Sequence, residues 1–536
     1  MLTTAAAPRP ATALSPYSEP WTWETARHLL LRASFAPAPA EIDTALSLGL
    51  EGTIDRLLSG PPLPAPLNYR LEDHPYYGMG ESWAGKPLVR ERLQEDNQTR
   101  ANSLRAWLVL QMLESGLSAR PKMLLFWHNH FSSNGGSADV RYDYLKKCGE
   151  YAFGNARELV KAVTVDASML IFLDGVRNLA RNPNENFARE VLELYTVGKG
   201  QQVADGDYTN YTEQDVTELA KAFTGWRIRY NANTNPVQLP QVYFDSRHHD
   251  KTTKRLSHRF DSAEIANGEE NEYATVIDLL FGREATALHL CRKLYRHFVY
   301  FRIDAAVERE VIAPLARLMI ESDYQVAPVL RALFSSEHFY RPEFRGAMIK
   351  TPLDYMVGIY RPLGLLDGVD PIGTYYLARR MESFCNQLDM VPHSPPSVAG
   401  WPAYYQEPNF HRLWLGSATL QRRVTLFRGI SRNGLRLNEV LYRADWPAVV
   451  ADFPDPYDLA AVVDEMGRRL LAVDLLPAQA NDIVALVLNG QEDFVWTNEF
   501  SDYMSNPNDN RIVNALRRRI LSIVYSIGEL AEYQLM

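Results

Sequence analysis

The sequence predicts a mainly α-helical fold: a large multi-helix globular protein with a small β-hairpin inserted near residues 235–260. Apolar residues recur at helical spacing along most of the chain, as Leu104, Trp107, Leu108 and Met112 do. The 46% apolar and 23% charged residues are ordinary globular values. The alternation of apolar and polar residues that is typical of strands occurs only in the short stretch that we assign to the hairpin.

Single hydrophobic cores stop growing near roughly 250–300 residues, so a chain of 536 residues is long enough for more than one. We divide it into a flexible N-terminal segment (1–20), an N-terminal helical half (21–228), a hairpin or loop insertion (229–272), a C-terminal helical half (273–430) and a C-terminal helical extension (431–536).

In the first half, Ala26, Leu29 and Leu30 share one face of a helix, and a second helix begins near residue 40 after proline breakers. Residues 60–80, rich in Pro and Tyr, are predicted to form a loop. Further helices are predicted at about 87–116, 121–130, 138–150, 155–163, 185–197 and 213–224.

The hairpin prediction rests on Val237, Leu239, Val242 and Phe244, which are followed by polar turn residues and then by the segment 255–258. Helical periodicity then returns. Helices are predicted at 274–282, 284–300, 306–320, 325–336, 346–366, 372–384 and about 410–430, and in the extension at about 457–472, 477–488 and 509–534.

Bulk properties exclude several classes of protein. A net charge of −9 without a concentrated basic face disfavours binding to nucleic acid. No apolar run approaches the ~20 residues of a membrane span. The first 20 residues lack a signal peptide, which favours a soluble cytoplasmic protein. Three widely spaced cysteines fit no disulfide framework.

The first candidate site is His128 and His130 within the segment 126–131, Phe-Trp-His-Asn-His-Phe. Two imidazoles two residues apart share a metal if the backbone is extended, because alternate side chains then point the same way. On a regular helix they point roughly 200° apart and cannot chelate together. Buried neutral imidazoles with hydrogen-bond partners are the competing structural interpretation.

The second candidate is the helix 185–197, where Asn186, Glu190 and Glu193 form a polar stripe beside an apolar one. Two neighbouring carboxylates suit acid–base work or cation binding. The structural alternative is a solvated face in which Arg189 pairs with Glu185 and Glu193. Asparagine at the start of this segment suits a helix N-terminus.

Two further segments carry polar or rigid character. His249 and Asp250 at the predicted hairpin tip would orient an imidazole or offer ligands to a metal held elsewhere, although the pattern by itself favours an exposed turn. The loop 395–402, Pro-Pro-Ser-Val-Ala-Gly-Trp-Pro, is predicted to pack or to form a pocket wall.

These segments together, in this order, resemble the bacterial family called domain of unknown function 1800 over roughly residues 21–430. The matching segments are 28–35, 126–131, 169–174, 184–190, 211–216, 223–226, 249–250, 293–299, 395–401, Trp414 and Arg422–Arg423. Tyr195 stands where relatives often carry Phe or His, and Ser168 where Pro is common, so no histidine ligand is assumed at 195.

The resemblance favours a functional role for His128, His130 and Glu190. It implies no established reaction. Many relatives begin with an export signal, which we do not find here. The family often accompanies domain of unknown function 1501, which resembles alkaline phosphatases and sulfatases. The resemblance therefore implies that a protein of this second family is a partner of the chain. It also implies that the chain could reach the periplasm by being exported together with that partner.

The leading functional hypothesis is a metal-dependent hydrolase or oxidoreductase in which His128, His130 and Glu190 hold one divalent metal ion. Glu193 or the pair His249 and Asp250 would add ligands, and Arg189 would steady an anionic substrate. The alternatives are a non-catalytic helical scaffold or chaperone-like partner of an exported enzyme, and a carbohydrate-active protein prompted by 10 Trp and 28 Tyr. The substrate itself cannot be derived from the sequence.

Overall fold

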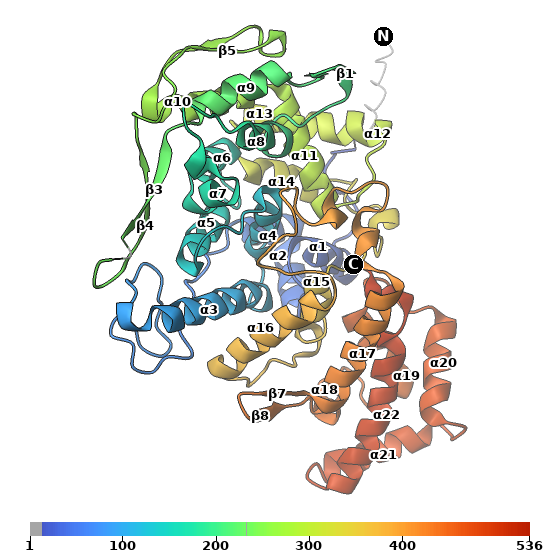
Figure 1. Ribbon diagram of the computed structural model, residues 1–536. Coiled ribbons are helices and arrows are strands. Elements are labelled where there is room, and N and C mark those ends of the chain that lie inside the picture. The colour runs from blue at the N-terminus through green and yellow to red at the C-terminus, as the bar shows by residue number, and fades with distance from the viewer. Residues whose placement is uncertain (1–12, 232) are drawn as a thin grey trace, which may run out of the picture.

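Helices dominate the computed structural model, which describes residues 13–231 and 233–536 (Figure 1). The mainly α fold with small hairpins is the predicted one. Within the predicted N-terminal segment, residues 1–12 lie outside the described residues. The next few residues are attached to the body, because the Tyr17 backbone N–H donates to the Ser335 carbonyl at 2.7 Å.

The predicted N-terminal half is built from helices of 6 to 21 residues. Their bounds are α1 (Trp23–Ala33), α2 (Pro39–Leu58), α3 (Leu93–Leu113), α4 (Arg120–Phe131), α5 (Ala138–Glu150), α6 (Ala156–Thr164), α7 (Ala167–Phe172), α8 (Glu185–Glu190) and α9 (Glu213–Ala222). A π-helical segment, η3 (Val191–Tyr195), continues directly from α8.

The second half and the extension are also helical. Their bounds are α10 (Glu272–Phe281), α11 (Glu284–Phe298), α12 (Ala305–Val307), α13 (Ala313–Glu321), α14 (Val326–Phe334), α15 (Pro352–Val357), α16 (Pro371–Asn386), α17 (Ser417–Asn433), α18 (Trp446–Ala451), α19 (Leu459–Leu470), α20 (Pro477–Leu488), α21 (Phe494–Ser505) and α22 (Asn510–Gly528). A second π-helical segment, Glu308–Ile312, joins α12 to α13.

The strands of the described residues form two-stranded antiparallel sheets. These pair β1 (Gln202–Ala204) with β2 (Asp207–Tyr208), β3 (Trp226–Asn231) with β4 (Gln238–Phe244), β5 (Lys254–Arg255) with β6 (Glu264–Ile265), and β7 (Leu435–Leu437) with β8 (Val440–Tyr442).

The main hairpin pairs differently from the prediction. Strand β4 pairs with the preceding β3, placing Trp226 opposite Phe244 and Ile228 opposite Val242, whereas we expected it to pair with residues 255–258. The apolar alternation of β3 carries this register. Residues 245–253 instead form turns closed by Asp245 and Asp250.

Three other segments differ from the sequence prediction. The predicted helix 346–366 is reduced to α15 and a 3₁₀ turn, Arg361–Leu363. Helices α18 and α21 were not predicted, although Asp445 caps the first turn of α18 by accepting from the Ala448 N–H. Helices α15 and α18 are short segments of six residues with side-chain caps, whereas α21 has twelve residues and no side-chain cap.

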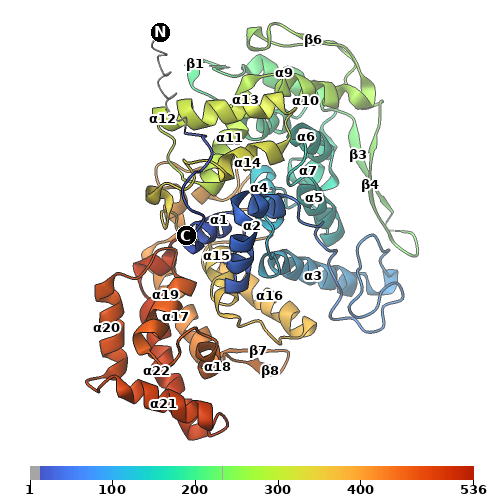
Figure 2. The same cartoon turned by 180° about the vertical axis from the view of Figure 1, so that it is seen from behind.

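Helix α4 lies near the centre of the molecule in both views, with α5 beside it (Figures 1 and 2). Every residue of α4 except Arg120 and Asn129 is buried. Helices α3 and α16 pack side by side next to it, and α17 to α22 gather at one end of the molecule. A helix buried on all sides must place its polar side chains against specific partners.

Within residues 13–231 and 233–536, no helix combines the length and the apolar character needed to cross a membrane.

Candidate functional site

The two histidines of α4 contact different parts of the protein. Because α4 is a regular helix here, His128 and His130 point to different sides of it, as helical spacing predicts. His128 lies beside Tyr144 of α5, and His130 beside Tyr195 of η3. The two imidazoles therefore do not converge on one ligand.

His130 is fully engaged by neighbouring groups. Its Nε2 lies 3.3 Å from the Tyr195 carbonyl, and Lys293 Nζ lies 3.1 Å from its Nδ1. With Nε2 donating to the carbonyl and Nδ1 accepting from the amine, no ring nitrogen remains free. Burial, followed by the charge of Lys293, lowers its pKa well below the usual value.

The π-helical turn η3 explains how residues near 130 and 190 come together. A π-helix interrupts the regular i→i−4 hydrogen bonds, and such turns are frequent at functional sites. The Leu194 carbonyl accepts from Lys293 Nζ at 2.9 Å and from His289 Nε2 at 3.1 Å. The contact of His130 with this region therefore runs through the backbone of Tyr195, one turn beyond Glu190.

The carboxylates of this region have separate neighbours. Arg189 forms a two-pronged ion pair with Glu213, at 2.7 and 2.6 Å, rather than the helical pairs with Glu185 and Glu193. Glu193 accepts from the Tyr211 hydroxyl and lies 3.3 Å from Lys199 Nζ.

Glu190 is the carboxylate of α8 whose environment disfavours its charge. Burial, followed by the charge of Glu193, raises the pKa of Glu190. As expected for the start of this helix, the Asn184 side chain accepts from the Phe187 N–H.

His249 belongs to a buried network beneath the hairpin. Its Nε2 lies 3.1 Å from Glu272 Oε2, and its Nδ1 lies 3.0 Å from the Thr224 carbonyl. Lys254 Nζ, also buried, lies 2.6 Å from the other oxygen of Glu272. Asp250 accepts from Thr252 and lies 3.6 Å from Lys254.

These positions spread the predicted metal ligands over several elements. In the part of the chain that the structure describes, no group of three or more His, Cys, Asp or Glu side chains is arranged to hold a metal ion. The divalent metal ion therefore stays a prediction that rests on sequence pattern.

His128 differs from the other predicted ligands because one ring nitrogen makes no regular hydrogen bond. Its Nδ1 lies 3.4 Å from the Tyr144 hydroxyl, whereas its buried Nε2 has no well-formed hydrogen bond among the described residues and has the Pro392 carbonyl as its nearby acceptor. Burial, followed by the charges of His393 and Arg141, lowers the pKa of His128 to about 3. His128 is therefore a neutral imidazole at pH 7.

The proline-rich loop that follows α16 packs onto α4 beside His128. The Trp401 N–H donates to the Asn129 side-chain oxygen at 2.9 Å, and Asn134 Nδ2 donates to Ser394 Oγ at 3.0 Å. The Trp401 ring contacts His128 edge-on, with centroids 5.9 Å apart. Because Trp401 is only 1% exposed, its ring face is not open for stacking on a sugar.

The same loop brings His393 to a carboxylate of α16. His393 Nδ1 lies 3.3 Å from Glu382 Oε1, and Arg379 Nη1 lies 3.4 Å from Glu382 Oε2. Burial acts to raise the pKa of Glu382, but His393, Arg379 and Arg105 outweigh it and lower that pKa. Burial lowers the pKa of His393 despite Glu382.

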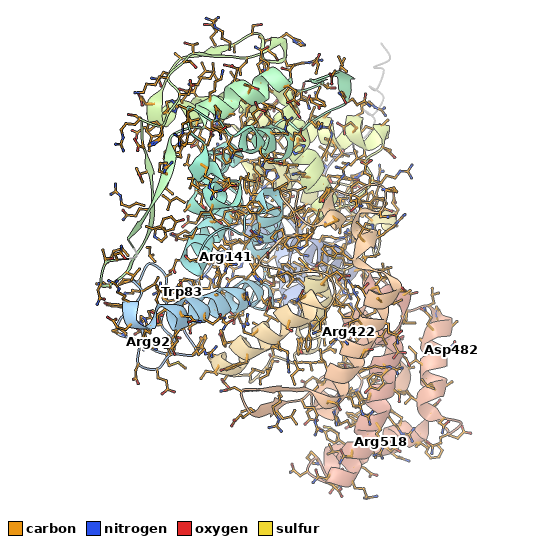
Figure 3. The ribbon with its side chains drawn as sticks, viewed as in Figure 1. Trp83, Arg92, Arg141, Arg422, Asp482 and Arg518 are labelled. Carbon is orange, nitrogen blue, oxygen red and sulfur yellow. The ribbon has the colours of Figure 1, made fainter. Side chains whose placement is uncertain are left out.

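Three arginines surround this pair, and we call them the arginine cluster: Arg105 of α3, Arg141 of α5 and Arg379 of α16. All three are half-buried, and Arg141 lies where α5 approaches α3 (Figure 3). Burial and the charge of Arg105 lower the pKa of Arg141. Neither Arg105 nor Arg141 side chain forms a hydrogen bond or ion pair with the described residues, and the Nε of each is buried.

Comparison with known protein families identifies the family of this chain. The family model described as Protein of unknown function (DUF1800) matches residues 28–529. The chain belongs to the DUF1800 family. No curated protein and no solved structure matches it.

Two DUF1800 segments thus meet at His128, since the segment 126–131 and the segment 395–401 lie against each other. Sequence reasoning missed the arginine cluster, Glu382 and His393. Only His393, in the stretch between Pro392 and Pro395, carried a usable signal, because a histidine in a stiff loop beside a recognised segment is an unusual placement.

Proposed function

We propose that this DUF1800 protein binds a small anionic molecule at the arginine cluster. The observation that carries the proposal is the state of Arg105 and Arg141, whose guanidinium groups have no partner among the described residues. Guanidinium groups held half-buried without a counter-charge cost free energy, and a carboxylate or phosphate would supply the missing charge and acceptors.

The local charge balance supports an anion rather than a neutral ligand. Three guanidinium groups face a single carboxylate, Glu382, which His393 and Arg379 already approach within 3.4 Å. The planar fork of arginine matches the oxygens of carboxylates and phosphates, and each charge-assisted hydrogen bond contributes roughly 1.5–3 kcal/mol.

A neutral imidazole next to the cluster supports chemistry on such a ligand. The pKa of His393 is lowered, so its ring is neutral at pH 7 and can accept a proton from a reacting group in general base catalysis. The pKa of His128 is about 3, which makes His128 too weak a base for that role. The function proposed is therefore an acid–base enzyme, of the hydrolase class, in which His393 is the base for an anionic substrate.

A panel of probes tests the binding. Purified protein is melted with citrate, glycerol phosphate or sulfate, with neutral glycerol as the control, because a ligand that binds only the folded state raises the melting temperature. We expect at least one anion to stabilise the wild type but not Arg105→Gln/Arg141→Gln. Equal shifts in both proteins, or none in either, would overturn the proposal.

A metal-dependent hydrolase or oxidoreductase is the second candidate. It is favoured by Glu190, whose pKa is raised by burial and by Glu193, a penalty that a divalent cation would relieve. Elemental analysis distinguishes it: a stoichiometric metal in the wild type should be lost in His128→Ala/His130→Ala and kept in the exposed control His258→Ala. Metal-free wild type would remove this candidate.

The scaffold hypothesis draws support from the closed pairs elsewhere. His130, His249 and Arg189 are engaged within the chain, as buried networks that fix helix packing would be. Co-expression with a domain of unknown function 1501 protein is the test. Co-elution as a stoichiometric complex would favour the partnership, and separate elution would count against it.

A further inference from the structure

A second group of buried cations lies around α15, apart from the arginine cluster. The group comprises Arg27, Arg32, Lys122, Lys350 and Arg423, all of which are buried. They come from α1, α4, the segment before α15, and α17. Burying five cations requires compensation, since an unpaired charge is strongly disfavoured away from water.

One carboxylate, Asp354, sits among them, and it is already engaged. Lys122 Nζ lies 2.5 Å from Asp354 Oδ1, and Thr351 Oγ1 donates to Asp354 Oδ2 at 2.7 Å. Lys122 also lies over the Phe35 ring. Asp354 therefore compensates one cation of the five.

The other four cations rely on neutral groups. Arg32 Nη2 donates to the Phe344 carbonyl at 2.6 Å, and Arg423 Nη2 donates to the Lys350 carbonyl at 2.8 Å. Lys350 Nζ lies over the Tyr533 ring at 4.2 Å. Among the described residues, no carboxylate forms an ion pair with any of the four, and Arg32 Nε and Nη1 have no hydrogen-bond partner. Burial lowers the pKa of Lys350 to about 7, so the positive excess of the group rests mainly on its three arginines.

A cavity of about 20 Å³ adjoins Asp354. Its walls include Lys122, His297, Thr351, Asp354, Tyr404 and His411. The volume slightly exceeds what one water molecule needs, so the space admits a ligand of one or very few atoms.

An imidazole nitrogen at this cavity lacks a partner. His411 Nε2 is buried and has no hydrogen-bond partner in the described part of the chain. The Ile349 N–H donates to His411 Nδ1 at 3.1 Å, which fixes the tautomer and leaves the proton on Nε2. His411 thus offers an unused N–H donor at a cavity whose walls also carry Lys122 and Arg296, beside the Asp354 carboxylate that Lys122 engages.

We propose that this cavity binds a small monovalent inorganic anion of halide size, such as chloride. An N–H donor, a lysine and the surplus positive charge all favour an acceptor that carries negative charge. A water molecule would satisfy the donor but would leave the charge uncompensated. The proposal is independent of the function proposed for the arginine cluster, because the two sites share no residue.

Bromide locates the site directly. Crystals of the full chain are grown with bromide in place of chloride, and anomalous data are collected at the bromine edge. We expect a peak within hydrogen-bonding reach of His411 Nε2, inside the cavity. An empty cavity, or water density without an anomalous peak, would overturn the proposal.

A second test measures anion binding in solution and begins with the wild-type protein, so it does not depend on a variant that folds. The ³⁵Cl line width is titrated on the wild-type protein, where exchange with a buried site broadens the line and bromide reverses the broadening. His411→Phe should abolish both effects, whereas the exposed His258→Phe should keep them. Wild-type protein that gives no saturable broadening, or broadening that His411→Phe leaves intact, would contradict the assignment.

Discussion

The Asn129 side-chain oxygen accepts a hydrogen bond from the Trp401 N–H at 2.9 Å, joining two segments that lie 272 positions apart. Gly400 makes the approach possible, since its φ is +92° and a Cβ there would meet Asn129 Oδ1 at 2.3 Å. The contact holds the proline-rich loop, and with it His393, against α4.

Gly400→Ala should therefore destabilise the protein and displace the loop. The left-handed conformation alone costs roughly 1–3 kcal/mol for a non-glycine residue, and the clash with Asn129 adds to it. Gly368→Ala is the matched control, because Gly368 has φ +77° with no atom near its Cβ. Urea unfolding should give a larger loss for Gly400→Ala, and equal losses would show that the close approach to Asn129 is unimportant.

Arg141→Gln should leave stability nearly unchanged, within roughly 1 kcal/mol, because the side chain has no partner among the described residues and is repelled by Arg105. Arg100→Gln is the contrast. Arg100 Nη1 lies 2.7 Å from the buried Asp139, and breaking such a pair costs about 3–5 kcal/mol. Similar unfolding free energies for the two variants would argue against a ligand-binding role for Arg141.

Lys122→Met should cost about 3–5 kcal/mol, because it leaves Asp354 buried and unpaired. Adding Asp354→Leu should recover part of that loss, since the double variant buries no uncompensated carboxylate. A double-mutant cycle by chemical unfolding measures the coupling. Additive losses would mean that the two side chains do not form the pair described.

The pH dependence of stability should carry a contribution from His128. Its folded-state pKa of about 3 lies below the ordinary 6.5, so the unfolded chain binds the proton first and stability falls as pH drops below about 6.5. His128→Asn should flatten this fall by roughly 1.4 kcal/mol per pH unit between pH 6 and 4. His258→Asn reports the effect of losing an exposed imidazole. A slope identical to that of the wild type would show that His128 is protonated in the folded state.

Long helices were predictable because each buries a sustained apolar stripe. The divergence of His128 and His130 also followed from helical spacing, once 121–130 was recognised as a helix. The π-helical turn at 191–195 was not predictable. It is accompanied by hydrogen bonds to His130, His289 and Lys293, which come from helices distant in sequence.

The arginine cluster escaped prediction for a related reason. Arg105, Arg141 and Arg379 belong to three helices, and each looks like an ordinary surface arginine within its own period. Only the packing of α3 against α16 and α5 reveals that their guanidinium groups gather around Glu382 and His393. The spacing of residues in the sequence predicts which side chains share a face of one helix. It does not predict which side chains of different helices come together.

Calorimetric titration of inorganic phosphate into the wild type and Arg105→Gln/Arg141→Gln at low ionic strength tests the central claim most directly. We predict saturable binding of one phosphate to the wild type and at least about tenfold weaker binding to the variant, because each lost charge-assisted contact is worth roughly 1.5–3 kcal/mol. Absence of binding to the wild type, or equal affinity in both proteins, would contradict an anion site at the arginine cluster.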